Sequence, residues 1–246
     1  MSDTVVASTF SLRASDGASL FVYRWLPQAP LQSRTAPVRA VIQVVHGAAE
    51  HAGRYDRLAR VLVRHNYAVY ADDHRGHGRT AGSLERAGIV GADSWERMLL
   101  DLRELTACAA DAHPGAPIVL LGHSMGSMLG QAYAQRFGEC IDGLILSGSA
   151  SSLAAGAEDL AERADVAVAR DGADAPSMDF AALFAGFNDA FTSDGASATG
   201  FEWLSRDTEE VARYVGTERT RIDRGNVLPR RVGQRNGRAE NAGQRG

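Results

Sequence analysis

Short apolar strands that alternate with amphipathic helices constrain the fold of this chain more than any other feature of its sequence. Four runs are short and apolar, as strands buried on both faces of a sheet are: 40–45, 67–71, 117–121 and 141–146. Helical patterns occupy the intervals at 54–65, from the cap Asp93-Ser94 to about Ala112, and from 125 to about 137. The alternation predicts an α/β protein with a mostly parallel sheet.

Two further segments flank this alternation. Residues 5–13 and 19–26 read as strands on either side of a turn signal, so a hairpin is expected at the start. Residues 151–214 contain no convincing strand, and we expect them to form a helical insertion packed over the sheet. Its aromatic and aliphatic residues form an apolar cluster: Phe180, Leu183, Phe184, Phe187 and Phe191.

Length and composition fit an ordinary globular chain. It has 246 residues, 45% of them hydrophobic, with a formal net charge of -4, which is enough to bury a sizeable core. No apolar run approaches the roughly 20 residues of a membrane span, and the start lacks a secretory layout, so we expect a cytoplasmic protein. Cys108 and Cys140 are too few for a disulfide framework and are expected to be buried free thiols.

Charge is unevenly distributed along the chain. All 26 basic residues are arginine, and 8 of them fall in residues 217–246, against 3 acidic residues and no aromatic residue. Such a composition predicts a disordered basic tail. Because it lacks aromatic side chains for base stacking, we expect no nucleic-acid partner. We therefore divide the chain into a core at 1–150, an insertion at 151–216 and a tail at 217–246.

A serine lies in a G-x-S-x-G pattern at 122–126, directly after an expected buried strand and before an expected helix. This context makes the short pattern informative, because a sharp strand-to-helix turn holds the hydroxyl of Ser124 above the carboxyl end of the sheet. The amide of Met125, at a helix N-terminus, points at the same space and can stabilise an oxyanion. In a hydrolase of this architecture the loop 46–51 supplies a second amide, for which Ala48 is the candidate.

Two groups of histidines and carboxylates, at 46–51 and 72–77, raise the question of a metal site. Neither group has the helical histidine spacing or the cysteine pairs of strong zinc motifs. We expect no metal there. Residues 72–78 are instead expected to form a hydrogen-bonded loop that braces the site.

Taken together, these segments resemble the α/β-hydrolases of the monoacylglycerol lipase and bacterial lysophospholipase group, also described as serine aminopeptidase-like hydrolases. The resemblance covers about residues 8–216, and residues 203–214 look like the end of that group's cap. The matching segments keep the order and spacing of the group: His46–Tyr55, Asp73–Arg79, Gly122–Ser127 and Gly143–Gly148.

The resemblance implies an α/β-hydrolase fold in which Ser124 is the nucleophile and the amides of Ala48 and Met125 form the oxyanion hole. It also implies that 151–216 are a helical cap lining an acyl-binding tunnel. The substrates would be carboxylic esters with a long acyl chain, such as monoacylglycerols or lysophospholipids, and no cofactor is expected. Oligomeric state and a transient contact of the cap with a membrane stay open.

The chain departs from the group after the cap. In this fold the triad acid and then the triad histidine follow the serine along the chain, but no histidine follows Ser124 and no strand-like segment follows Tyr214. We therefore expect the C-terminal strands and helix of the core to be missing, with the triad acid unassigned and no triad histidine found. One hypothesis is that the arginine- and glycine-rich tail is an out-of-frame reading of a high-GC gene.

This departure predicts impaired activity, because a serine without a general base is a weak nucleophile. It also predicts an uncovered sheet edge, low stability and aggregation. Three alternatives remain: a non-catalytic lipid-binding or interaction protein of the same fold, an enzyme in which His74 or His77 replaces the missing base, and a small-ester esterase or peptidase.

Overall fold

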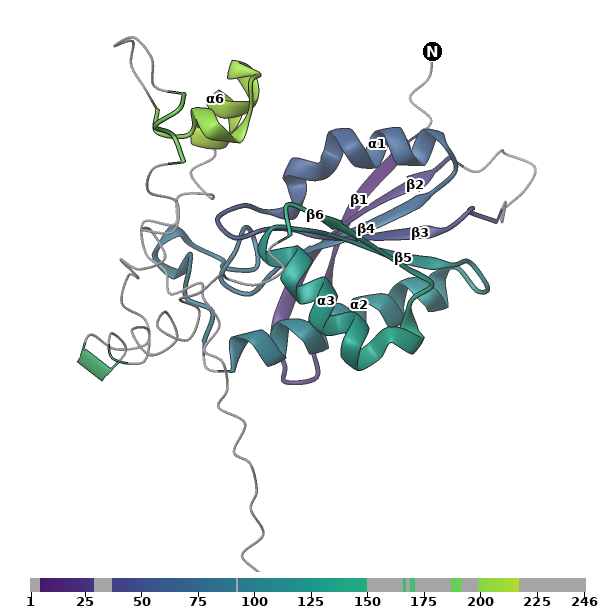
Figure 1. Cartoon of the computed structure of the whole chain (residues 1–246). Helices are drawn as coiled ribbons and strands as arrows, with labels where there is room; N and C mark the ends of the chain where they lie inside the picture. The colour runs from purple at the N-terminus through teal and green to yellow at the C-terminus, as the bar shows by residue number, and fades with distance from the viewer. Residues whose placement is uncertain are drawn as a thin grey trace, which may run out of the picture.

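The computed structural model describes residues 5–28, 37–91, 93–149, 166, 169–170, 187–191 and 199–216. At its centre is a six-stranded, mostly parallel sheet of order β1-β2-β4-β3-β5-β6 (Figure 1). β1 pairs antiparallel with β2 and β2 antiparallel with β4, whereas β4, β3, β5 and β6 run parallel. The strands are β1 Val5–Arg13, β2 Ser19–Pro27, β3 Val41–Val45, β4 Ala68–Asp73, β5 Ile118–His123 and β6 Gly143–Ser147. The predicted hairpin and the predicted α/β arrangement are confirmed.

Helices cover both faces of this sheet. α1 (Asp56–Arg64) lies on one face, and α2 (Ser94–Ala112) and α3 (Met125–Phe137) lie on the other (Figure 1). The helix expected over 54–65 is divided between η1 and α1. The remaining elements are the short 3-10 helices η1 Ala52–Tyr55, η2 Leu84–Arg86, η3 Gly138–Cys140 and η4 Glu202–Leu204, and the helix α6 Thr208–Gly216.

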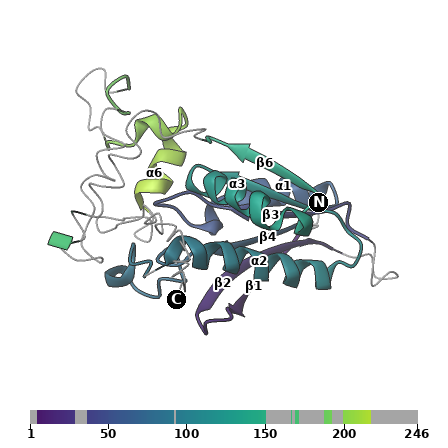
Figure 2. The same ribbon diagram turned by 60° about the horizontal axis from the view of Figure 1, so that its bottom comes forward.

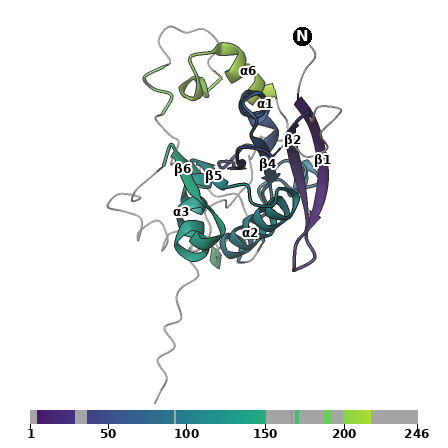
Figure 3. The same cartoon turned by 90° about the vertical axis from the view of Figure 1, so that its right-hand side faces the viewer.

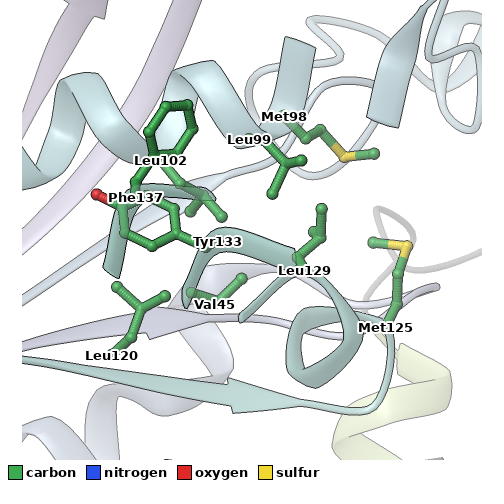
Figure 4. Close-up of a cluster of buried hydrophobic side chains, with 9 residues drawn as sticks. All are labelled: Val45, Met98, Leu99, Leu102, Leu120, Met125, Leu129, Tyr133 and Phe137. Atoms are coloured by element: carbon green, nitrogen blue, oxygen red, sulfur yellow. The ribbon is translucent and has the colours of Figure 1, made fainter. Parts of the chain in front are cut away.

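The two faces of β3 show why this strand reads as a continuous β-branched run. Val45 points to the side of α2 and α3, whereas Ile42 and Val44 pack on the side of α1. Because successive side chains alternate between faces, a strand covered on both sides is mostly apolar. The buried Gln43 is the exception in β3: it donates to the carbonyl oxygen of Leu102 and accepts from the hydroxyl of Thr106. Figure 4 shows the cluster between the sheet and α2 and α3: Val45, Met98, Leu99, Leu102, Leu120, Met125, Leu129, Tyr133 and Phe137.

Two local expectations from the sequence are wrong. α2 begins where predicted, but Asp93 has a left-handed backbone (φ 53°) and its side chain makes no capping hydrogen bond. Its carbonyl oxygen instead accepts a hydrogen bond from the amide of Arg97 at 2.9 Å. Cys108 and Cys140 are free, but both are half-buried rather than buried.

β6 is less covered than the central strands of the sheet. It is the last strand of the sheet in the described chain (Figure 2). Ile145 is 48% exposed and Leu146 41% exposed, whereas β3 and β4 are buried along their whole length. Within the described residues, one edge of the sheet therefore presents large apolar side chains to solvent.

Most of the expected cap and all of the expected basic tail at 217–246 lie outside the described residues. Phe180, Leu183 and Phe184 also lie outside them. Phe187 and Phe191 are described, and both are about half exposed, so these two rings are not buried as a core cluster would be. No helix in the described part of the chain is long and apolar enough to cross a membrane.

Candidate active site

Ser124 lies at the turn between β5 and α3 in a backbone conformation that a serine rarely adopts. Its φ is 52° and its ψ is -120°, a conformation that costs of order 1–3 kcal/mol and persists only where neighbouring structure imposes it. The turn is fixed on both sides. Its amide donates to the carbonyl oxygen of Ser147 at 2.9 Å, and its carbonyl oxygen accepts from the amide and the hydroxyl of Ser127 at 2.8 and 2.6 Å.

Glycines two residues before and after the serine allow this turn to form. A Cβ added to Gly122 would lie 2.3 Å from the carbonyl oxygen of Gly126. A Cβ added to Gly126 would lie 2.0 Å from the carbonyl oxygen of Val45, in β3. The G-x-S-x-G pattern is therefore required here by close backbone packing between α3 and two strands.

The loop after β3 lies directly against the serine. A Cβ added to Gly47 would be 3.1 Å from the Cβ of Ser124. The amide of Gly47 donates to Glu50 Oε1 at 2.6 Å, so the next amide of the loop, that of Ala48, is the candidate oxyanion donor. Met125 is the first residue of α3, and a first-turn amide has no partner within its own helix. The predicted site residues are thus brought to one place, while their roles stay predictions.

A buried carboxylate, that of Glu50, organises this loop. Oε1 accepts hydrogen bonds from the amide of Gly47 and from the hydroxyl of Tyr55 at 2.7 Å, and Oε2 accepts from Arg54 Nη1 at 2.7 Å. Burial, together with the negative charge of Glu50, raises the pKa of Tyr55. The phenol therefore keeps its proton and acts as a donor to the carboxylate.

Three buried imidazoles lie close together next to the loop, and two of them, His46 and His74, are stacked. The ring centroids of His46 and His74 are 3.9 Å apart, and those of His46 and His77 are 5.2 Å apart. His46 Nδ1 donates to the carbonyl oxygen of Gly47 at 2.7 Å, and Nε2 accepts from the amide of His74 at 3.0 Å. Because one ring nitrogen donates and the other accepts, the His46 imidazole is neutral in this arrangement. Burial and the neighbouring imidazoles lower the pKa of His46 well below its ordinary value.

The other two rings also serve the loop rather than the serine. His74 Nδ1 lies 2.9 Å from Asp72 Oδ2. Burial lowers the pKa of His74, but the charge and hydrogen bond of Asp72 outweigh it, so its pKa is raised overall. His77 Nδ1 donates to the carbonyl oxygen of Arg75 at 2.8 Å, and burial lowers the pKa of His77 to about 4. The Nε2 atoms of both rings have no hydrogen-bond partner among the described residues, so neither ring is hydrogen-bonded to Ser124 there.

Asp73 links the loop at 72–78, which the sequence predicts to brace the site, to the helix η1. Its carboxylate accepts hydrogen bonds from the amides of Ala52 at 2.8 Å and Arg79 at 2.7 Å. Burial raises the pKa of Asp73 to about 6. Gly78 has a φ of 47°, and a Cβ there would lie 2.2 Å from Asp73 Oδ2. Across the part of the chain that is described, no three His, Cys, Asp or Glu side chains are arranged to hold a metal ion.

Two structural side chains near the site were not singled out from the sequence. Arg75 forms paired hydrogen bonds with Asp101 on α2 at 2.6 and 2.7 Å and with Asp16 in the first hairpin at 2.7 and 3.0 Å. No local sequence pattern predicts contacts between residues that lie so far apart along the chain. Arg54 bonds to Glu50, and here the spacing of four residues was a usable signal for an ion pair.

The strained turn at Ser124, on a mostly parallel sheet, identifies the fold as that of the α/β-hydrolases. The sequence model of the family described as serine aminopeptidase, S33, matches residues 36–226, and the chain belongs to that family. The match runs past Gly216, where we expected the resemblance to end, so that boundary was placed too early. The family assignment confirms the resemblance drawn from the sequence motifs.

Two relatives and one solved structure show how far the similarity extends. The chain is 40% identical over 112 residues to a monoacylglycerol lipase of Mycolicibacterium smegmatis, and 37% identical over 115 residues to the monoglyceride lipase of Homo sapiens. These alignments cover 46% and 47% of this chain but 38% and 34% of the relatives. A thermostable carboxyl esterase from Bacillus coagulans superposes with a TM-score of 0.71 at 26% identity, over 86% of this chain and 66% of the esterase. The chain therefore spans well under half the length of these two lipases.

Proposed function

We propose that Ser124 is the nucleophile of a carboxylic ester hydrolase. Its Oγ would bond to the ester carbonyl carbon and its proton would pass to a base. The alcohol would then leave with that proton as the tetrahedral oxyanion collapses to an acyl-serine, and water would hydrolyse the acyl-serine to release the carboxylic acid and regenerate Ser124. The observation that carries this proposal is the strained backbone of Ser124, held between β5 and α3 by glycines that admit no side chain. The amides of Ala48 and Met125 would stabilise the oxyanion, an interaction worth about 3–4 kcal/mol per donor in characterised hydrolases.

For the substrate we propose an ester with a long acyl chain, such as a monoacylglycerol or a lysophospholipid. The support is that the two relatives above are named monoacylglycerol and monoglyceride lipases. The fold similarity to a carboxyl esterase favours a second candidate, a small-ester esterase. We further propose a core at 1–150, a cap at 151–216 and a cytoplasmic location.

We propose that this chain by itself turns over esters slowly. The three buried imidazoles beside the site are His46, His74 and His77, and their bonded Nδ1 atoms contact Gly47, Asp72 and Arg75. No histidine follows Ser124 in the sequence. A site that keeps its oxyanion donors but lacks triad members retains a residual acceleration of about 10³–10⁴ over water.

Acylation of Ser124 by a nitrophenyl ester, with and without added imidazole, tests the proposal. Free imidazole can act as the external base that the chain lacks, so we expect it to increase formation of an acyl adduct located at Ser124 by mass spectrometry. Ser124→Ala under the same conditions corrects for direct hydrolysis by imidazole. An adduct at Ser124 that prefers long-chain over short-chain esters supports the lipase-like substrate class. No adduct at Ser124 under any condition, with saturable binding of a long-chain lipid, would instead support a non-catalytic lipid-binding protein.

A further inference from the structure

Glu50 stands between the loop that faces Ser124 and a helix that comes from a distant part of the chain. On one side Glu50 Oε1 holds the amide of Gly47 at 2.6 Å. On the other side Oε2 holds Arg54 Nη1 at 2.7 Å. The carboxylate is buried, and a buried charge is stable only while its partners remain in place. Any movement of Arg54 therefore changes the environment of the group that fixes the Gly47 amide.

Arg54 also contacts α6, through the ring of Tyr214. Its guanidinium carbon lies 4.9 Å from the centroid of the Tyr214 ring, within the range of a cation–π interaction. Burial raises the pKa of Tyr214, although the charge of Arg54 opposes this, so the ring meets Arg54 as a neutral phenol. Glu50, Arg54 and Tyr214 thus form one continuous set of contacts from the loop to α6.

Residues of α6 other than Tyr214 also hold this helix in place. Arg57 pairs with Glu210 at 2.8 Å, and Val211 is buried. Figure 3 shows α6 beside α1, the helix that carries Arg57. Two arginines from consecutive elements, one in η1 and one in α1, therefore contact the same helix. Of these two arginines, Arg54 is the one that also bonds to the carboxylate that organises the loop.

We propose that Glu50 is a positioning residue that couples the docking of α6 to the geometry of the oxyanion loop at residues 46–50. When α6 is docked, Tyr214 holds Arg54 over Glu50, and Glu50 holds the Gly47 amide, which leaves the adjoining Ala48 amide directed at the space beside Ser124. When α6 moves away, Arg54 is released and the carboxylate loses a partner. The loop then loosens. The inference rests on the proposed function, because it assigns the loop an oxyanion role.

Hydrogen–deuterium exchange of the full chain, read by mass spectrometry on peptides covering 46–51 and 208–216, tests the coupling without requiring hydrolysis. Tyr214→Leu removes the ring and keeps an apolar side chain, whereas Tyr214→Phe keeps the ring and serves as the matched control. We expect Tyr214→Leu to speed exchange about tenfold at 46–51, equivalent to about 1.4 kcal/mol of lost coupling, and Tyr214→Phe to match the wild type. Unchanged exchange at 46–51 in Tyr214→Leu, or equal acceleration in both variants, would overturn the coupling.

Glu50→Gln tests the positioning role from the other end. The amide oxygen can still accept from Gly47, but the charge that attracts Arg54 is gone, so we expect faster exchange at 208–216. Glu96→Gln removes another carboxylate–arginine pair, with Arg136 between α2 and α3, and should change neither peptide. Unchanged exchange at 208–216 in Glu50→Gln would contradict the proposal.

Imidazole-dependent acylation of Ser124 separates positioning from mere stability. In Tyr214→Leu we expect the maximal acylation rate to fall at least threefold while the ester concentration for half-saturation stays constant. A change in half-saturation alone would place α6 in substrate binding and overturn the positioning role. If the wild-type chain forms no adduct at all, the proposed function fails, whereas the exchange measurements still decide whether α6 and the loop are coupled.

Discussion

Gly126 is the residue at which the turn around Ser124 is least tolerant. A methyl group there would overlap the carbonyl oxygens of Val45 and His46, at 2.0 and 2.5 Å, and both belong to the backbone, which cannot rotate away. Gly126→Ala should therefore lower the free energy of unfolding by about 1–3 kcal/mol or more, measured by urea denaturation. Gly138, at the other end of α3, has an ordinary helical backbone and nothing within 4 Å of an added Cβ.

Gly138→Ala is thus the control, and it should be neutral or stabilising by about 0.4–1 kcal/mol. Equal losses in the two variants would mean that the close packing of α3 on β3 does not set the cost.

His77 makes the free energy of unfolding depend on pH, and its pKa fixes the direction of this dependence. Its pKa lies near 4 in the folded chain, against 6.5 ordinarily, so between these values the unfolded chain binds the extra proton. Stability contributed by the neutral ring is present above 6.5 and is lost as the pH falls towards 4, with a slope of up to about 1.4 kcal/mol per pH unit. His77→Gln should flatten the dependence of the unfolding free energy on pH across this window.

Asp73 acts with the opposite sign, since burial raises its pKa from 3.8 to about 6. Its neutral form favours the folded chain, so this contribution is lost as the pH rises through 6. The difference between the wild type and His77→Gln, rather than the wild-type curve alone, isolates the histidine. Parallel curves would show that His77 does not titrate as its burial implies.

At the level of elements, Arg75 joins the first hairpin to α2. Its partner Asp101 has a side chain only 3% exposed, so Arg75→Met would leave a buried carboxylate without its counter-charge. We expect a loss of about 3–5 kcal/mol in unfolding free energy. Arg97 also approaches Asp16, at 3.7 Å, but is 41% exposed, so Arg97→Met should cost less than about 1 kcal/mol. Chemical denaturation of both variants checks this, and similar costs would refute the assigned role of Arg75.

The elements themselves were largely predictable from local sequence. Short apolar runs predicted β3, β4 and β5, and the glycines around Ser124 predicted the turn, because both signals reside in neighbouring residues. Asp93 was misjudged because its backbone is left-handed, whereas a capping side chain normally requires an extended backbone. The roles of Glu50 and Arg75 depend on partners brought together only by the tertiary fold, such as Tyr214 and Asp101. The exposure of β6 depends equally on which elements lie next to it.

For the whole molecule, the exposed edge strand is the feature most relevant to solubility. Ile145 lies on β6 and is about half exposed, and exposed apolar edge strands promote association. Ile145→Lys should therefore reduce concentration-dependent light scattering with little change in unfolding free energy. Leu129→Lys, in the buried core of α3, should instead unfold the protein. Unchanged scattering in a folded Ile145→Lys variant would show that association does not start from this edge.

The central proposal is that Ser124 is a nucleophile and that a general base is what limits its reaction in this sequence, in which no histidine follows Ser124. Steady-state hydrolysis of a nitrophenyl ester tests it in two proteins: the 246-residue chain, and a chimera in which residues 217–246 are replaced by the C-terminal region of the Mycolicibacterium smegmatis lipase. Because the triad acid and histidine follow the serine in this fold, we predict slow residual turnover for the chain and much faster turnover for the chimera that disappears with Ser124→Ala. Rapid, Ser124-dependent turnover by the chain alone, or a folded chimera without activity, would contradict the account.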